Sequence, residues 1–299
     1  MRLVLCEIGL LWSLFAQAPE VPAPKPADKL TNTGSPLRVA FQCTNEDMDW
    51  AGMTCTEDEP CPVYLELAAV ESVGNRIFLA GNIHSNSVTL YSLLLASDDG
   101  GRTWTEPYDR IRGVEFDHIQ FIDFETGWVA GQVLVPVAQD PFLLITSDSG
   151  KTWRRRAIFG ENRAGTISQF WFNSRTNGVL LIDRAQSGDD SRYELYESMT
   201  GGESWMLREV NDKPIALKHV FIPNTDWRIH ADAASKSFRI EKRQGDKWTV
   251  LGSFLVSIAA CKPVQPAETQ SPAPDTTPPQ PETAPAPAPR RTPPTLKKK

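Results

Sequence analysis

Ser97-Asp98-Asp99-Gly100-Gly101-Arg102-Thr103-Trp104 is an eight-residue stretch with Ser, Asp, Gly, Thr and Trp at positions 1, 3, 5, 7 and 8. The second glycine permits the positive φ that a tight turn between strands requires. The carboxylate and the hydroxyls can bond the amides of the turn itself. The tryptophan can bury a large apolar surface where two sheets meet. The stretch therefore predicts a structural turn and not a reactive site.

The pattern recurs along the chain. Thr146-Ser147-Asp148-Ser149-Gly150-Lys151-Thr152-Trp153 begins with Thr, and Ser198-Met199-Thr200-Gly201-Gly202-Glu203-Ser204-Trp205 has Thr200 in the Asp position. A degenerate fourth copy, Arg243-Gln244-Gly245-Asp246-Lys247-Trp248, keeps only Gly and Trp. The four tryptophans follow one another at intervals of 49, 52 and 43 residues, close to the length of one propeller blade.

The segments between these turns are typical of β-strands. Most alternate apolar and polar residues, and polar turns separate them. Apolar strands are also expected directly before the first two turns. The sequence therefore predicts an all-β fold, a β-propeller with four to five blades of four antiparallel strands each. The predicted strands include Leu65–Val70 with Arg76–Gly81, His118–Phe124 with Gly127–Gly131, Ser168–Phe172 with Gly178–Leu181, Lys218–Ile222 with Trp227–Ala231, Tyr91–Ala96 and Phe142–Ile145.

These repeats resemble the Asp-box, also called the bacterial neuraminidase repeat. The Gly-Trp-Val-Ala-Gly stretch from Gly127 to Gly131, followed by a box, is similar to the domain of the photosystem II assembly and stability factor family. The resemblance covers about Val63 to Val250 and implies a propeller fold. It implies little about activity, because Asp-boxes also occur in sialidases, xyloglucan hydrolases and sortilin-type receptors.

Length argues against a sialidase. The segment from Leu37 to Cys261 holds 225 residues, whereas six blades of about 48 residues would need about 288. The Phe-Arg-Ile-Pro motif of sialidases is missing, and its nearest match, Phe221-Ile222-Pro223, lacks the arginine. A glycosidase would need two carboxylates across a cleft. The candidates for these are Asp117, Asp123, Asp183 and Glu194, although turn and surface carboxylates are far commoner.

We therefore expect a non-catalytic protein-binding or assembly scaffold whose protein partner is unknown. The alternative is a sialidase-like or glycoside-hydrolase-like enzyme, or a lectin. An aromatic or Arg-rich patch on a propeller face would favour binding. A concave pocket with convergent carboxylates of shifted pKa would favour catalysis.

Proline and charge divide the chain into regions. Of 24 prolines, twelve lie within 262–299 and five within 19–36. These ends are interpreted as a disordered basic tail and a linker around a propeller at 37–261. The net charge of −6 leaves the propeller acidic, which argues against nucleic-acid binding. Lys297-Lys298-Lys299 is interpreted as a solubilising end, with contact to an anionic cell-envelope surface as the alternative.

The N-terminus resembles an export signal. Arg2 precedes an apolar run from Leu3 to Phe15, and Ala16-Gln17-Ala18 has the form of a cleavage site. The sequence predicts a signal peptide over 1–18, a periplasmic or secreted protein, and no transmembrane span in the mature chain. Glu7 and Pro19 are unfavourable for cleavage, so an uncleaved anchor and a misplaced start codon stay open.

The cysteines agree with an oxidising compartment. After Cys6 in the leader, four remain: Cys43, Cys55, Cys61 and Cys261. Their spacing is not that of a zinc site, so two disulfides are expected. We favour Cys55–Cys61 and Cys43–Cys261, with pairing of Cys43 to Cys55 or Cys61 as the alternative.

The favoured Cys43–Cys261 disulfide is linked to a prediction of how the ring of propeller blades closes. Arg38–Cys43 and Phe254–Cys261 are each interpreted as a strand ending on a cysteine. We expect the two strands to lie together in the closing blade, where they would protect its edge.

Other motifs are interpreted as structural. No cofactor or metal site is expected, and the four histidines lack ligand spacing. Asn45, Asp47 and Asp49 resemble the start of a calcium loop, but Trp50 replaces its glycine, so a solvated loop is expected. Arg154-Arg155-Arg156 is interpreted as a charged edge that blocks strand pairing, with a docking patch for an acidic partner as the alternative.

Overall fold

The computed structural model describes residues 29–134, 137–160, 163–184, 192–216 and 226–263. The predicted signal peptide, most of the predicted linker, nearly all of the predicted tail and the expected strand Lys218–Ile222 lie outside these residues. Within the described ranges, strands dominate and a single short helix, α1 (Asn45–Ala51), interrupts them. No helix there is long and apolar enough to span a bilayer.

Besides one two-stranded sheet, the described strands form four antiparallel sheets, three of them four-stranded, so the protein has the all-β, propeller-like fold that the sequence predicts. The first sheet has the order β17-β2-β3-β4, the second β6-β7-β8-β9, the third β10-β11-β12-β13 and the fourth β14-β15-β16. Their bounds are β2 Cys61–Val73, β3 Arg76–His84, β4 Thr89–Ser97, β17 Ser257–Cys261; β6 Val114–Phe121, β7 Gly127–Val133, β8 Gln139–Thr146, β9 Arg154–Ala157; β10 Thr166–Phe172, β11 Gly178–Asp183, β12 Tyr193–Ser198, β13 Met206–Asn211; β14 Trp227–Asp232, β15 Ser237–Gln244 and β16 Lys247–Leu255.

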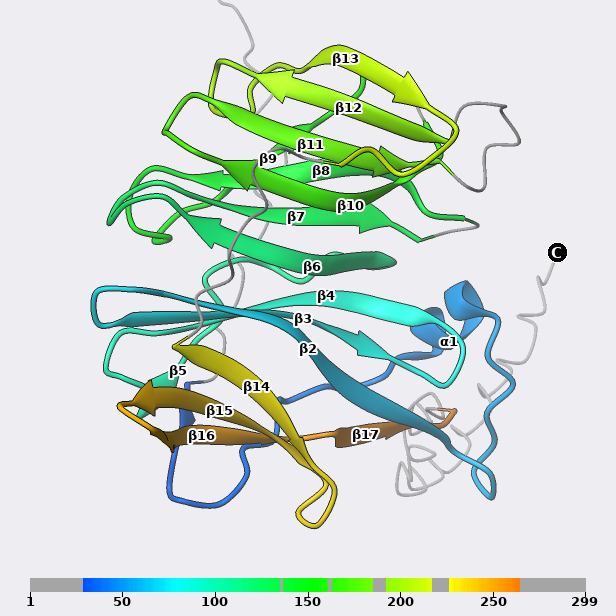
Figure 1. The fold of residues 1–299 in the computed structure, drawn as a ribbon. Helices are drawn as coiled ribbons and strands as arrows, with labels where there is room; N and C mark the ends of the chain where they lie inside the picture. The colour runs from blue at the N-terminus through cyan, green and yellow to red at the C-terminus, as the bar shows by residue number, and fades with distance from the viewer. Residues whose placement is uncertain (1–28, 135–136, 161–162, 185–191, 217–225, 264–299) are drawn as a thin grey trace, which may run out of the picture. The chain divides into compact units, whose positions relative to one another are not determined.

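The sheets pack on one another in succession. Strand β14 contacts β2, strands β2, β3 and β4 contact β6, and β10 contacts the second sheet (Figure 1). Strands β3 and β7 are buried along nearly their whole length, which explains their continuous apolar sequences. Trp128 of β7 stacks on Phe172 of β10 with ring centroids 3.7 Å apart, and these two rings join the second and third sheets.

Two side-chain amides join neighbouring sheets at equivalent positions. Asn82 of β3 is fully buried and accepts a hydrogen bond from the Phe116 amide of the second sheet at 2.8 Å. Gln132 of β7 accepts one from the Ile167 amide of the third sheet at 3.2 Å. Both amides follow an Ala-Gly pair in the sequence. The sequence therefore repeats Ala-Gly followed by Asn or Gln. This repeat could have predicted the two contacts between sheets, but the sequence analysis did not use it.

The box turns are closed by their own side chains. In the first box, Ser97 Oγ accepts from the Gly101 amide at 2.8 Å, and Asp99 Oδ1 accepts from the Thr103 amide at 2.8 Å. The Thr103 hydroxyl donates to Asp99 Oδ2 at 2.6 Å. Gly101 has a φ of 90°, in the region that favours glycine.

The second box repeats these bonds. The Gly150 amide donates to Thr146 Oγ1 at 2.9 Å, and the Thr152 amide and hydroxyl donate to Asp148 at 2.9 and 2.6 Å. Such bonds lower the pKa of both box aspartates to about 2. For Asp99 the Thr103 hydroxyl is the main cause, and for Asp148 the Thr152 bonds outweigh the opposing effect of burial.

The third box keeps the turn without the aspartate. The Gly202 amide donates to Ser198 Oγ at 2.9 Å, and Thr200 Oγ1 accepts from the Ser204 amide at 3.0 Å. The tryptophans differ more than their sequence pattern suggests. Trp104 is fully buried, whereas Trp153 and Trp205 are half-buried.

The described structure includes residues before the boundary predicted at Leu37. Strand β1 (Leu30–Thr31) pairs with β5 (Thr103–Trp104), so this part of the linker prediction is wrong. The Asn32 side chain donates to the Leu251 carbonyl at 2.9 Å and to the Gly101 carbonyl at 3.3 Å. Asn32 thus joins the first box to the fourth sheet.

The structure pairs Cys43 with Cys261 and Cys55 with Cys61, the pairings that the sequence favoured, with Cα–Cα distances of 5.1 and 5.3 Å. The strands around the long-range disulfide differ from expectation. Residues 38–43 form no strand; only Leu37 bridges to Phe254, in parallel. Strand β17 pairs with β2 of the first sheet instead, because a break at Val256 separates it from β16. The prediction of two terminal strands paired together is therefore wrong.

Candidate binding site

Helix α1 occupies the stretch that was expected to be a solvated loop, so that expectation is wrong. Thr44 and Asp47 form a capping box: the Asp47 amide donates to Thr44 Oγ1 at 3.1 Å, and the Thr44 amide donates to Asp47 Oδ2 at 3.0 Å. Gly52 ends the helix with a φ of 61°. The signature Thr-x-x-Asp followed by Gly was present in the sequence, but the spacing of acidic residues was interpreted as a failed calcium loop.

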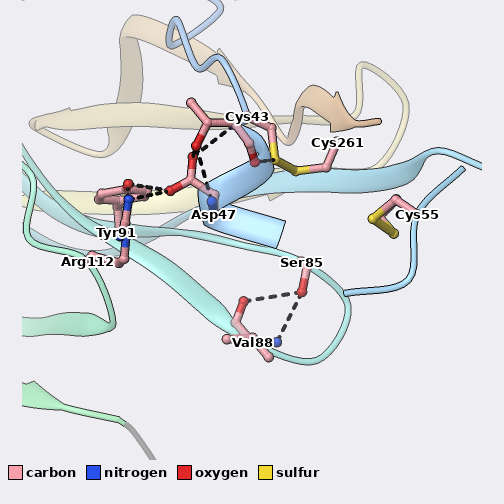
Figure 2. Close-up of a disulfide and its surroundings, with 10 residues drawn as sticks. Cys43, Asp47, Cys55, Ser85, Val88, Tyr91, Arg112 and Cys261 are labelled. Carbon is pink, nitrogen blue, oxygen red and sulfur yellow. Dashed lines mark hydrogen bonds and ion pairs between the residues drawn. A yellow bond between two sulfur atoms is a disulfide. The ribbon is translucent and has the colours of Figure 1, made fainter. Parts of the chain in front are cut away.

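Asp47 anchors the helix to the first sheet. Its side chain is buried, and its Oδ1 accepts from the Tyr91 hydroxyl of β4 at 2.5 Å and lies 3.0 Å from Arg112 Nη2 (Figure 2). Burial opposes ionisation, but bonds from Tyr91 and Thr44 and the charge of Arg112 outweigh it and lower the pKa of Asp47. Burial, followed by the bond to Asp47, raises the pKa of Tyr91. This pair therefore keeps its charge states across the neutral pH range.

Arg112 completes the network from the segment between the first and second sheets. Its Nε donates to the Tyr91 hydroxyl at 3.1 Å and its Nη1 to Glu46 Oε1 at 2.7 Å. The guanidinium also lies over the Tyr91 ring, 5.7 Å from the centroid. Arg110, two residues earlier, is held by a bidentate pair with Glu106 at 2.6 and 2.8 Å.

These groups surround a cavity of about 290 Å³ beside the helix. Phe41 and Tyr91 line it as a tilted aromatic pair with centroids 5.9 Å apart. The Cys43–Cys261 disulfide (Figure 2) lies two residues after Phe41 in the sequence and fixes the segment that carries it. The cavity is lined by Ala40, Phe41, Gln42, Thr44, Glu46, Asp47, Tyr91, Arg110 and Arg112, and we call it the α1 pocket.

The chemistry of the α1 pocket suits recognition. Tyr and Arg are the residue types most enriched where binding energy concentrates. The described lining contains no cysteine or histidine, and both of its carboxylates are paired, Asp47 with Tyr91, Thr44 and Arg112, and Glu46 with Arg112. An aromatic, Arg-rich patch was the feature expected of a binding module.

A second cluster bears on the catalytic alternative. Asp117 stands at a register shift of the inner strand β6, and Gln132 Nε2 lies 3.3 Å from both Glu115 Oε2 and Asp117 Oδ2. Burial, with the charge of Glu115, raises the pKa of Asp117 to about 8. The two carboxyl groups share a hydrogen bond. Paired glycosidase carboxylates stand about 5 Å or more apart, which leaves room for the sugar or water between them.

The other carboxylates named as catalytic candidates belong to ion pairs. Asp123 pairs with Arg175 at 2.6 Å and Asp183 with Arg192 at 2.9 Å. Glu194 is buried, and both Arg163 and Arg184 bind its Oε1, at 2.8 and 2.9 Å. The structure does not bring the four candidates together around one bond to be cleaved. Within the described ranges, no group of three or more His, Cys, Asp or Glu could hold a metal ion.

The arginines of the suggested docking patch already have partners. Arg154 and Arg156 of β9 both pair with Glu203 of the third box. Arg155 lies over the Phe142 ring, 3.9 Å from its centroid. All four residues of β9 are exposed. The arrangement fits a charged outer edge that is tied to the next sheet.

Comparisons with known proteins identify no family. No family model matches the chain, and no curated protein matches it. Among solved structures, "YCF48 bound to D1 peptide" matches with 13% identity and a TM-score of 0.32. The match covers 64% of this chain and 53% of that one, so the chain spans about half the length of that structure. At this TM-score the two folds superimpose only loosely.

Proposed function

We propose that the protein is an extracytoplasmic, non-catalytic Asp-box propeller that binds a protein partner through the α1 pocket. The observation that supports this proposal is the pocket itself. Its aromatic pair and two arginines surround a cavity of about 290 Å³, and each of its ionised groups is paired within the protein. A pre-organised surface of this kind loses little freedom on binding.

The supporting features extend beyond the pocket. Two disulfides fit a protein that matures in an oxidising compartment. The hydrogen bonds of the first two boxes match the roles that the Asp-box resemblance implies for Ser or Thr, Asp and Gly. The box residues are occupied in holding turns, so they leave the loops and the α1 pocket to carry function.

The test of binding compares two aromatic residues in the full chain. Phe41 lines the α1 pocket, and Phe124 is 63% exposed elsewhere on the protein. The immobilised protein is used to capture partners from a cell-envelope extract. We expect Phe41→Ala to lose a specific captured protein and Phe124→Ala to retain it. Equal capture by both variants, with both folded by circular dichroism, would refute the pocket as the binding site.

The enzymatic alternative has its own test. The full chain is screened against aryl-sialosides and a panel of β-glucans, and we expect no turnover. Turnover that Asp117→Asn or Glu115→Gln abolishes would overturn the non-catalytic proposal, because these groups form the carboxyl pair with a raised pKa.

A further inference from the structure

The four cysteines of the described chain lie together at one end of the first sheet. Cys61 is the first residue of β2 and Cys261 is the last residue of β17, and the two stand directly opposite each other in the antiparallel pair. Cys43, Cys55 and Cys261 belong to one core cluster (Figure 2), and Cys61 packs against it. The two disulfides are therefore neighbours, and each contributes one sulfur to the same cross-strand pair.

This cross-strand pair has the geometry of a third disulfide. Residues directly opposite each other in an antiparallel pair point to the same face of the sheet, with Cα atoms about 4.5 or 5.5 Å apart. Disulfides span Cα–Cα distances of about 4.4–6.8 Å. Cys61 and Cys261 can therefore bond to each other while β2 and β17 stay in register. An ion pair between Lys262 Nζ and Glu57 Oε2, 3.3 Å apart, holds the two segments together beside this pair.

The four cysteines differ in their access to solvent. Cys261 is fully buried, and Cys43 and Cys55 are 7% and 8% exposed. Cys61 is partly exposed, and residues 56–60 before it are all exposed. Within the described structure, a reductant in solution therefore reaches the Cys55–Cys61 disulfide at Cys61, whereas the Cys43–Cys261 disulfide is shielded from it.

We propose that Cys61 is the centre of a thiol–disulfide exchange, in which a dithiol reductant converts the two disulfides into a single Cys61–Cys261 disulfide. A thiolate of the reductant attacks Cys61 Sγ, and Cys55 leaves as a thiolate that takes up a proton. The second thiol of the reductant displaces Cys61 and closes the reductant's own disulfide. The Cys61 thiolate then attacks Cys261 Sγ, the bond to Cys43 breaks, and Cys43 leaves and is protonated. One dithiol is oxidised, one protein disulfide is lost, and the two protons of the dithiol end on Cys43 and Cys55.

The exchange moves the covalent link from the helix segment to the sheet. In the oxidised protein, residues 43–55, which carry α1, are tied at one end to β17 and at the other end to β2. In the exchanged form both ties are gone, and β17 is linked to β2 directly. The reductant therefore loosens the segment beside the α1 pocket and leaves the first sheet closed. An effect on the capture of a partner rests on the proposed function, whereas the exchange itself does not.

Partial reduction of the full chain tests the exchange. Cys6 is replaced by Ser in every sample, so that only the four cysteines of the fold react. The oxidised protein is exposed to limiting dithiothreitol, its free thiols are trapped with N-ethylmaleimide, and its disulfides are mapped by mass spectrometry. In molecules with two free thiols, we expect these to be Cys43 and Cys55, with Cys61 linked to Cys261. If those molecules instead keep Cys43–Cys261, or keep Cys55–Cys61, the proposal is wrong.

Two matched variants isolate the role of the Cys61 thiol. Cys55→Ser and Cys61→Ser both remove the short disulfide, but only Cys55→Ser leaves a thiol opposite Cys261. Under the same limiting dithiothreitol, the yield of free Cys43 should be at least about tenfold higher in Cys55→Ser, because the buried disulfide is then attacked from within the protein. Equal yields in the two variants would overturn the proposal. Partial reduction of the chain with all four cysteines needs neither variant, so it decides the proposal even if one of them fails to fold.

Hydrogen exchange measures the structural consequence. The amides of α1 should exchange at least about tenfold faster in the Cys61–Cys261 form than in the oxidised protein, while those of β3 keep their rates. Unchanged rates in α1 would show that the disulfides do not control the segment, and would overturn that part of the proposal. Partner capture by the oxidised protein, which tests the proposed function, depends on none of these results.

Discussion

The first and third boxes occupy the same place in their sheets and differ in what holds them. In the first box a carboxylate bonds both the amide and the hydroxyl of Thr103, and Trp104 is completely buried, with its indole nitrogen bonded to the Gly101 carbonyl at 3.1 Å. In the third box a hydroxyl takes the place of the carboxylate, and Trp205 is half-buried. Its indole nitrogen is buried without a hydrogen-bond partner in the described part of the chain.

The difference shows that the box turn can close whether or not the tryptophan after it is fully buried. A hydroxyl at the third position of the box can close the turn in place of a carboxylate, as Thr200 does. The tryptophan needs surroundings that the repeat does not supply. Around Trp104 these are β1 on one side and Phe254, whose ring lies 5.3 Å away, on the other. Trp205 has Phe172 as its aromatic neighbour, at 5.9 Å.

The largest expected effect concerns the tryptophans. Trp104→Ala removes a fully buried side chain and should lower the free energy of unfolding by about 3–5 kcal/mol. Trp205→Ala should lower it by about 1–2 kcal/mol, because part of that side chain already faces solvent. Urea unfolding followed by circular dichroism measures both. Equal losses would show that the burial difference has no energetic consequence.

The next effect concerns the acceptors of the turn. Asp99→Ala leaves the Thr103 amide and hydroxyl without their acceptor and should cost about 1–2 kcal/mol. Thr200→Ala removes weaker bonds at an exposed site and should cost about 0.5–1 kcal/mol. The same denaturation experiment applies. If Thr200→Ala lowered the free energy of unfolding more than Asp99→Ala does, the carboxylate would not be the stronger acceptor of the two turns.

The pH dependence of stability should distinguish the two boxes that contain an aspartate from the third box. Asp99 and Asp148 have a pKa of about 2, below their ordinary value of 3.8. A lowered folded pKa means that the stabilisation is complete above pH about 4 and is lost as the pH falls towards about 2. The free energy of unfolding, measured across that window, should fall less steeply in an Asp99→Asn, Asp148→Asn double variant. Thr200→Ala should leave the slope unchanged, and identical slopes in all three proteins would contradict the role of the carboxylates.

The smallest expected effect is an increase in stability. Thr200→Asp gives the third box the acceptor that the other two have, opposite the Ser204 amide and hydroxyl. It should add about 0.5–1 kcal/mol to the free energy of unfolding. Met199→Asp, one residue earlier at an exposed site, is the control and should give no gain. A loss of stability in Thr200→Asp would mean that the third turn is not equivalent to the first.

The sequence predicts the sheets well because their signals are local. The boxes, the alternation in strands such as Tyr193–Ser198 and the spacing of the tryptophans each lie within one repeat. Both disulfides were also favoured, since four cysteines leave few pairings. The fold class and the favoured pairings therefore needed no tertiary information.

The α1 pocket could not be predicted in the same way. Phe41, Tyr91 and Arg112 come from three separate segments, and only packing brings them together. The helix signal around Thr44 is seven residues long and competes with an acidic pattern that also resembles a loop. Whether a sheet face is packed against another sheet likewise depends on neighbours that one strand's sequence does not specify.

The pairing of β17 with β2 determines when the protein can finish folding during its synthesis. Cys43 and Cys261 are separated by 218 residues, and β17, which ends at Cys261, pairs with the beginning of β2 in the first sheet. Each of the other strands in that sheet leaves the ribosome long before β17 does. Until then the edge of β2 lacks β17, and Cys43 lacks Cys261, its partner in the folded protein. The sheet made first is therefore completed last, and a chain that stops short of Cys261 retains an open strand edge and an unpaired cysteine.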